Sequence, residues 1–140
     1  MSTLDRIMRE WLDVLAAGAF ERWPELVHED VVFRFPYAPP DMQSELRGAP
    51  EARAALLAMK SDKSLSWKDV KTWETSEPGM VVATLRAEAE LVNGQGYRND
   101  YVMLARFVEG KLIEHVEYFN PIPVQAAIQR AQRSGAERKK

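Results

Sequence analysis

The chain has 140 residues, of which 46% are hydrophobic and 29% charged, and its net charge is −2. These values are typical of one globular domain and give no electrostatic case for binding nucleic acid or an anionic membrane. The absence of cysteine excludes disulfides, thiol catalysis and thiolate metal sites. No apolar run approaches the roughly 20 residues of a membrane span, and no signal peptide is recognisable, so we expect a cytoplasmic protein.

The first part of the chain predicts two helical segments. Apolar side chains in residues 4–17 recur at the three- and four-residue spacing of one helix face. Ser2 or Thr3 can cap the start of this helix, and Gly18 can end it. A second, shorter helical segment with an apolar side is predicted at residues 19–27.

A strand, a loop and a third helix follow. Residues 31–37 alternate in the manner of a strand, and Pro36 indicates an edge position or the strand end. Residues 38–47 predict a polar loop, which we interpret as a flap over the mouth of a cavity. Pro50 begins the third helix, at a position where its missing N–H costs nothing.

From Leu65 the apolar period changes from helical to alternating, which predicts a meander of strands. Turn sequences separate these strands at residues 77–79, 93–94 and 109–110. A last helix is predicted at residues 124–132, and the charged end, residues 133–140, is expected to be disordered. We therefore predict a single domain over residues 1–132.

The turn at Glu109-Gly110 decides which side chains share a face of the last hairpin. A two-residue type I′ turn needs positive φ at both central positions, which suits glutamate poorly, so we prefer a three-residue loop in which only Gly110 is left-handed. Tyr101 then faces Glu117. The shared face carries Tyr97, Asn99, Tyr101, Met103, His115, Glu117 and Phe119. In the tighter turn the register slips by one, and Asp100, Val102 and Leu104 lie beside Glu117 instead.

This order of elements predicts an α+β fold, in which a curved antiparallel sheet packs against the N-terminal helices. Such a sheet is cone-shaped and open at one end. Its outer face would carry apolar residues that suit a homodimer through the sheet, namely Val102, Leu104 and Val116.

Several sequence segments together carry a family resemblance. They are the opening helix, Phe20-Glu-Arg-Trp, Val27-His-Glu-Asp-Val-Val-Phe, Tyr97-x-Asn-x-Tyr, Gly110-Lys-Leu and Glu117-Tyr-Phe-Asn. Over residues 4–128 the chain resembles the SnoaL-like branch of the nuclear transport factor two-like superfamily, which includes ketosteroid isomerase and the phenazine-biosynthesis A/B proteins. The resemblance implies a cystatin-like α+β barrel that hosts many chemistries, here polyketide cyclase-like, isomerase-like or phenazine-biosynthesis-like.

The resemblance also implies roles for particular positions. In the phenazine A/B proteins a glutamate seven residues after the hairpin glycine is the general acid/base, and Glu117 holds that position here. Their active-site histidine matches a position near Ala55, which argues against phenazine chemistry itself. The aspartate base of ketosteroid isomerase matches Phe35, and no Asp-Arg-Asp set of the epoxide hydrolases is recognisable.

The residues themselves favour Glu117 and His115 as the catalytic candidates. A lone carboxylate among apolar neighbours is costly to bury in its ionised form, and such a group suits general acid/base chemistry near neutral pH. His115, two residues away, could reach the same ligand. The structural alternatives are a solvent-open sheet face, a salt bridge from Arg34 or Arg98 to Glu117, and a His115 at the cavity rim bonded to a tyrosine.

The expected function is cofactor-free isomerisation, cyclisation or dehydration of a small hydrophobic ligand. The alternatives are a non-catalytic ligand-binding or accessory protein and a scaffold whose interior is filled. No metal site is predicted, since the one other histidine, His28, is expected in a surface loop. The candidate substrate-binding residues are Trp11, Leu15, Phe33, Phe35, Tyr37, Met59, Asn99, Tyr101, Met103 and Phe119.

Overall fold

One curved sheet organises the molecule in the computed structural model, which describes residues 2–60 and 62–138. The strands are β1 (Val27–Arg34), β2 (Glu45–Arg47), β3 (Asp62–Glu74), β4 (Met80–Leu91), β5 (Gly96–Val108) and β6 (Lys111–Phe119). Their order across the sheet is β2-β1-β6-β5-β4-β3. Every adjacent pair is antiparallel except β1 and β6, which are parallel.

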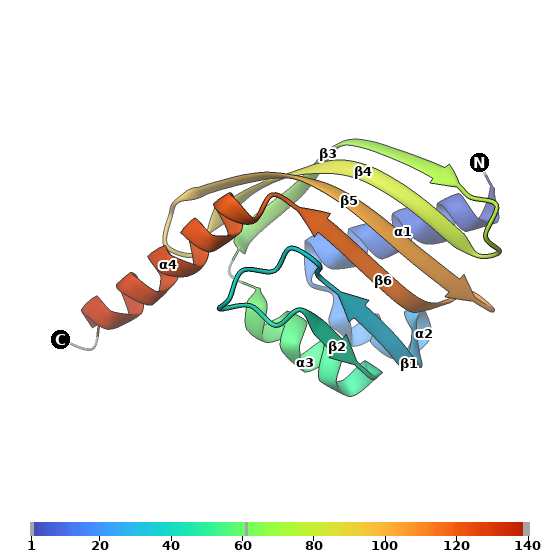
Figure 1. Cartoon of the computed structure of the whole chain (residues 1–140), viewed down its shortest axis with the longest axis horizontal. Helices are drawn as coiled ribbons and strands as arrows, with labels where there is room; N and C mark the ends of the chain where they lie inside the picture. Colours follow the sequence, from blue (N-terminus) through green and yellow to red (C-terminus); the bar gives the residue numbers. More distant parts are fainter. Residues whose placement is uncertain (1, 61, 139–140) are drawn as a thin grey trace.

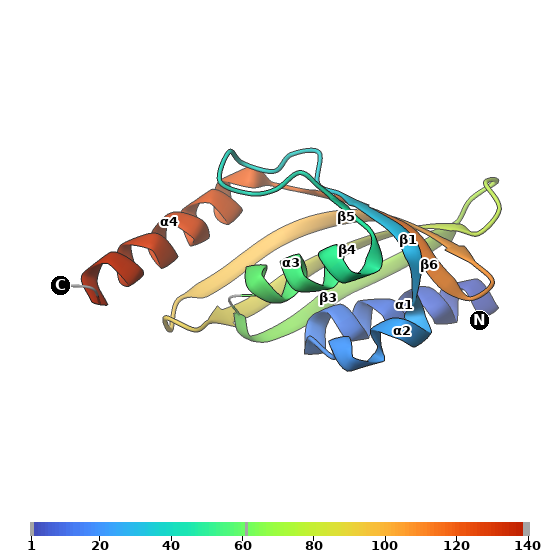
Figure 2. The ribbon, with the colours of Figure 1, turned by 90° about the horizontal axis from the view of Figure 1, so that it is seen from below.

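Helices cover one face of this sheet, as Figures 1 and 2 show. They are α1 (Thr3–Ala17), the short 3₁₀ helix η1 (Phe20–Arg22), α2 (Trp23–Leu26) and α3 (Ala49–Met59). The last helix, α4 (Pro121–Arg138), leaves the body at one end of the sheet. The predicted α+β fold, a curved sheet packed against the N-terminal helices, is therefore confirmed, with one parallel strand pair in it.

Helix α1 forms as its sequence predicts. The Ser2 hydroxyl accepts a hydrogen bond from the Asp5 N–H at 3.1 Å, and Gly18 ends the helix in the left-handed conformation. The apolar face of α1 packs against β3 and β4. Its buried side chains are Met8, Trp11, Leu12 and Val14. Packing against the inner face of the sheet buries them and supplies most of the helix's stability.

The region between α2 and α3 differs from its prediction. β1 begins at Val27 instead of residue 31, so His28 lies in a strand and not in a loop. The expected loop over residues 38–47 contains the short strand β2, in which buried Leu46 pairs with Phe33. β1 ends at Arg34, just before the Phe35-Pro36 step. The predicted alternation therefore does not continue to Tyr37.

The β5–β6 turn is the tighter kind, so the preferred three-residue loop is wrong. Glu109 and Gly110 have φ values of 50° and 80°, the two positive values of a type I′ turn, and Val108 pairs with Lys111. A bulge then places the extra residue Ile113 in β6, opposite the step from Arg106 to Phe107. Because the bulge shifts the register by one more residue, the predicted face is restored.

The bulge decides which residues lie beside Glu117. Met103 faces Glu117 and Tyr101 faces Phe119, so the predicted pairing of Tyr101 with Glu117 is wrong. The seven residues predicted to share a face do so, with Met103, His115 and Phe119 buried and the Glu117 side chain 16% exposed. Asp100, Val102 and Leu104 lie on the opposite face of β5.

The left-handed Glu109 gives a stability prediction. A non-glycine residue in this conformation costs roughly 1–2 kcal/mol, and asparagine bears it best. Glu109→Asn should therefore raise the free energy of unfolding by about 0.5–1 kcal/mol, measured by urea denaturation. The control Glu109→Gln removes the same charge without favouring the left-handed backbone and should give no gain. Equal stability of the two variants would contradict the turn assignment.

The structure shows further detail at the two ends of the meander. β3 is bulged between Lys68 and Lys71, with Asp69 at φ 53°. Helix α4 continues as far as Arg138, so the tail expected to be disordered from residue 133 is helical to that point. Lys139 and Lys140 lie outside the described residues. None of the described helices combines the length and apolar composition needed to cross a bilayer.

Candidate functional site

Glu117 and His115 lie on the inner face of β6, where the sheet meets α1. The Glu117 side chain is 16% exposed and that of His115 is 1% exposed. Glu117 is thus neither pointed into bulk solvent nor sealed in the core. Arg34 pairs instead with Glu114, at 3.8 Å on the outer face, which removes one structural alternative for Glu117.

A chain of hydrogen bonds joins three side chains from two elements. Trp11 Nε1 of α1 donates to His115 Nδ1 at 3.1 Å. His115 Nε2 lies 3.1 Å from Glu117 Oε1. Trp11 and Phe33 pack around the imidazole, with ring centroids 5.9 and 5.0 Å from it. The carboxylate is therefore not the unpaired group that the sequence suggested, because a buried histidine holds one of its oxygens.

His115 differs from both expectations for it. Its 1% exposure and its two hydrogen bonds leave neither ring nitrogen directed at a ligand. Its partners are Trp11 and Glu117, not a tyrosine at a cavity rim. The geometry suits a side chain that orients Glu117.

A second polar group lies on the same face of β5. The hydroxyls of Tyr97 and Tyr101 are 2.6 Å apart, and Asn99 Nδ2 donates to the Tyr97 hydroxyl at 2.9 Å. Asn99 also exchanges hydrogen bonds with the backbone of Asn120, donating to its carbonyl at 2.9 Å and accepting from its N–H at 3.2 Å. Asn99, which is 4% exposed, thereby fixes the chain where α4 begins.

Tyr97 of this group interacts electrostatically with Glu117. Burial raises the pKa of the Tyr97 hydroxyl, and the negative charge of Glu117 raises it further. Its hydrogen bonds with Tyr101 and Asn99 act in the opposite direction. The net shift is upward, so the Tyr97 hydroxyl keeps its proton and stays a donor at neutral pH.

The other candidate binding residues divide between core and surface. Trp11, Phe33, Phe35, Met103 and Phe119 are buried, and Leu15 is partly buried against the core. Tyr37 is 57% exposed and packs on Tyr118, with ring centroids 5.6 Å apart, so it is not brought to Glu117. Met59 is 37% exposed at the end of α3.

Sequence reasoning missed Trp67 of β3. Its indole N–H donates to the Leu12 carbonyl at 2.8 Å, and its ring meets Tyr101 edge to face at 5.7 Å. Trp67 therefore fixes α1 against the sheet and supports a tyrosine of the site. Its alternation with Leu65 placed it on a strand face, but nothing in the sequence identified α1 as its partner.

Neither of two hollows on the surface of the described residues is lined by Glu117 or His115. The larger, of about 1030 Å³, lies among α2, α3 and the β5–β6 turn, and Trp23, Arg53 and Lys111 contribute to its lining. The other, of about 530 Å³, lies between the 37–40 loop and the start of α4. Within the described residues, no three His, Asp or Glu side chains are grouped to hold a metal ion.

The sequence of this chain is similar to those of known proteins. The family model of the SnoaL-like domain matches residues 8–115. The chain belongs to the SnoaL-like family. This SnoaL-like chain is 25% identical over 112 residues to a PhzA/B-like protein of Pseudomonas aeruginosa, covering 79% of each chain. The resemblance seen in the sequence is thereby confirmed.

Solved structures support the fold. A candidate isomerase from Bacillus subtilis superposes with a TM-score of 0.75 at 23% identity, covering 91% of this chain and 96% of that one. A phenazine biosynthesis-related protein of Pseudomonas aeruginosa gives 0.69 at 18% identity, covering 90% and 83%. A neighbour from Burkholderia xenovorans described as NTF2-like gives 0.71 at 15% identity, covering 89% and 94%. At these identities the likeness shows a SnoaL-like, NTF2-like fold.

Proposed function

We propose that this SnoaL-like protein is a cofactor-free enzyme in which Glu117 moves a proton on a small hydrophobic substrate. The observation that carries the proposal is the inward-facing carboxylate of Glu117, 16% exposed and bonded through Oε1 to a buried histidine. Among the described residues, His115 is the hydrogen-bond partner of this carboxylate, through Oε1. Oε2 is thus the oxygen that would meet a substrate.

The bond to His115 also orients this carboxylate. His115 is 1% exposed and is itself held by Trp11, so Oε1 of Glu117 lies against a fixed partner. A base held in one orientation needs less rearrangement to take a proton from a bound substrate.

The proposed chemistry is proton transfer next to a carbonyl. Oε2 of Glu117 takes a proton from the carbon adjacent to a ketone, the C–H electron pair becomes a C=C bond, and the carbonyl π pair moves to oxygen to give an enolate. The Tyr97–Tyr101 hydroxyl pair, with oxygens 2.6 Å apart, supplies a hydroxyl donor on the same face. In a substrate whose enolate is conjugated with a C=C bond, returning the proton to the far carbon of that bond gives isomerisation. Attack by the enolate carbon on a second carbonyl gives cyclisation.

A test of this proposal needs no knowledge of the natural substrate. The protein is incubated in D₂O with 2-tetralone, a small cyclic hydrophobic ketone, and loss of its α-proton signals is followed by NMR. We expect exchange faster than in buffer and saturable in ketone. Saturable binding without accelerated exchange would instead support the alternative, a non-catalytic ligand-binding protein of the same fold.

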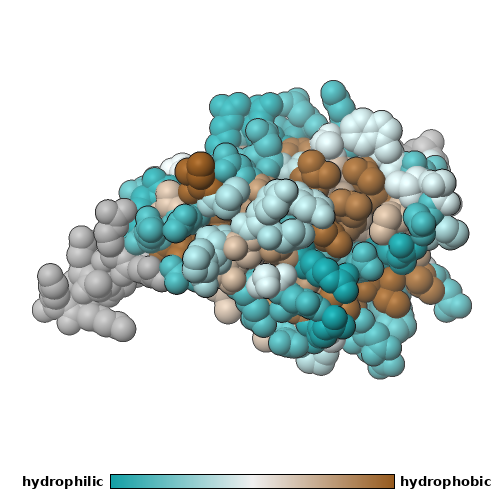
Figure 3. Space-filling view, viewed as in Figure 1, coloured by the Kyte–Doolittle hydropathy of each residue, from teal (hydrophilic) through white to brown (hydrophobic). Residues whose placement is uncertain are grey.

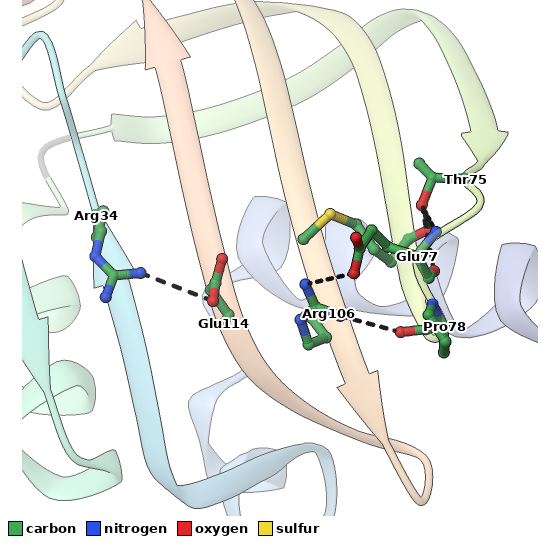
Figure 4. A network of polar contacts seen from close by, with 7 residues as sticks. Arg34, Thr75, Glu77, Pro78, Arg106 and Glu114 are labelled. Atoms are coloured by element: carbon green, nitrogen blue, oxygen red, sulfur yellow. Dashed lines mark hydrogen bonds and ion pairs between the residues drawn. The ribbon is translucent and has the colours of Figure 1, made fainter.

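The proposed protein partner is a second copy, bound through the outer face of the sheet. Val82, Leu104 and Val116 pair directly across β4, β5 and β6 on that face. Figure 3 shows brown hydrophobic atoms gathered over these strands. Two arginine–glutamate pairs lie beside this row, on the side toward the β5–β6 turn. They are Arg34–Glu114 and Arg106–Glu77, drawn in Figure 4. An apolar row beside charges of both signs suits the self-complementary contact of a two-fold dimer.

The dimer proposal predicts a specific effect of one substitution. Val102, which is 38% exposed, lies on this outer face. Val102→Glu should convert a dimer into a monomer, because an isologous contact would bring two added carboxylates into one apolar interface. Light scattering after size exclusion measures the mass. Val92→Glu, at a 68% exposed position just after β4, is the matched control and should remain dimeric. A monomeric wild type at high concentration would contradict the proposal.

A further inference from the structure

The bond between Trp11 and His115 restricts where the histidine proton can be. An indole N–H is a donor with no acceptor lone pair on that nitrogen. Trp11 Nε1 lies 3.1 Å from His115 Nδ1, so Nδ1 must offer a lone pair for the bond to exist. The imidazole proton is then on Nε2, the nitrogen that faces Glu117 Oε1 at 3.1 Å.

The other protonation states of His115 fit this geometry poorly. The Nδ1–H tautomer would place two N–H groups against each other at Trp11 and a lone pair against a carboxylate oxygen at Glu117. The doubly protonated imidazolium would keep the Glu117 bond but would again oppose two N–H groups at Trp11. With 1% exposure, His115 has no room for solvent to relieve either conflict.

We propose that Trp11 is a positioning residue that fixes His115 as the neutral Nε2–H tautomer. That tautomer directs its one proton to Glu117 Oε1 and leaves Oε2 for a substrate. Trp11 therefore acts on the reaction through two other side chains without touching the reacting atoms. The catalytic consequence rests on the proposed function, whereas the tautomer itself does not.

The experiment uses the full chain with ¹⁵N-labelled histidine and a long-range ¹H–¹⁵N NMR correlation at neutral pH, which reports which ring nitrogen is protonated. The protein has two histidines, and His28 Nδ1 also accepts a hydrogen bond, from the Asp30 N–H at 3.0 Å. His28→Gln leaves the His115 signals alone in the spectrum. We expect a protonated Nε2 and an unprotonated Nδ1 on His115.

Trp11→Phe in this background tests the cause. It keeps an aromatic ring in the core but removes the indole donor, so His115 should show a mixture of tautomers or the imidazolium. Trp23→Phe is the matched control, because Trp23 belongs to the same buried ring cluster but donates to the Ala49 carbonyl at 3.1 Å. The control should keep the Nε2–H signature of the parent.

Two outcomes would overturn the proposal. The first is an Nδ1–H tautomer or an imidazolium on His115 in the protein with Trp11 intact, a result that does not depend on whether Trp11→Phe folds. The second is an unchanged Nε2–H signature in folded Trp11→Phe.

The consequence for the reaction is measured separately. Where 2-tetralone exchange is catalysed, Trp11→Phe should lower kcat about 10- to 100-fold with little change in KM, because the carboxylate loses its fixed orientation. An unchanged kcat in a variant with an altered tautomer would remove the positioning role. If wild type catalyses no exchange, the proposed function fails, and the NMR result still decides the tautomer.

Discussion

Replacing Glu117 with glutamine should lower the rate of 2-tetralone exchange by about 10²- to 10⁴-fold, the range attributed to a positioned general base. A side-chain amide cannot accept the substrate proton. Its carbonyl oxygen can still accept the hydrogen bond from His115 Nε2, so the fold should be preserved. The rate is measured by NMR in D₂O, and the fold is checked by near-UV circular dichroism.

Glu114→Gln is the matched control for this prediction. Glu114 lies in the same strand on the outer face, paired with Arg34 at 3.8 Å, so the substitution removes an equal charge away from the site. Its exchange rate should equal that of wild type. If Glu117→Gln retains the wild-type rate, or if both variants lose it equally, Glu117 is not the base.

Gly79→Ala should destabilise the protein by about 2–5 kcal/mol, combining a strained backbone with an overpacked contact. Gly79 has φ 75°, and a Cβ added there would lie 2.3 Å from the Phe107 carbonyl oxygen. Phe107 also donates its N–H to the Gly79 carbonyl at 2.9 Å, so the two backbones cannot separate without breaking that bond. The free energy of unfolding in urea measures the loss.

Gly94→Ala separates the two causes of that loss. Gly94 has a similar φ of 85°, but an added Cβ would meet nothing within 4 Å. It should therefore lose only the roughly 1–2 kcal/mol of the left-handed backbone. Equal losses in the two variants would show that the close approach of Gly79 to Phe107 is absent.

The sequence predicted most of the fold because its signals are local. The spacing in residues 4–17 defined α1, and the alternation in residues 80–91 defined β4. The start of β1 was missed because His28-Glu29-Asp30 interrupts its alternation and pairs irregularly with β6. β2 was missed because it has three residues, of which Leu46 is buried, and so short a segment shows no alternation.

In the β5–β6 hairpin the predicted turn type is wrong, but the residues predicted to share one face do share it. Glu109 adopts positive φ despite its weak preference, because the type I′ turn matches the twist of long strands. The bulge at Ile113 then compensates, and a bulge of this kind has no clear sequence signal. Alternation along β5 and β6 still placed Glu117 on the same face as Tyr97 and Asn99. One face of the sheet is buried, and this fixes which alternate residues of each strand point inward.

Within the site, the sequence could predict contacts between residues of one strand face but not contacts between distant elements. His115 and Glu117 are two residues apart, so their proximity follows from strand geometry. The bond from Trp11 to His115 joins residues 104 positions apart and depends on how α1 packs on the sheet. Tyr37 was misplaced for a related reason, because alternation was extended beyond Pro36, where β1 has already ended.

The most direct test of the central claim is a crystal structure of the protein soaked with 2-naphthol, a planar mimic of the enol of 2-tetralone. We predict that the naphthol binds against the inner face of β5 and β6, within hydrogen-bonding distance of Glu117 Oε2, while His115 Nε2 remains bonded to Oε1. Two results would contradict the claim. One is a Glu117 carboxylate turned into bulk water, and the other is naphthol bound only in the larger surface hollow, beside Trp23 and Arg53.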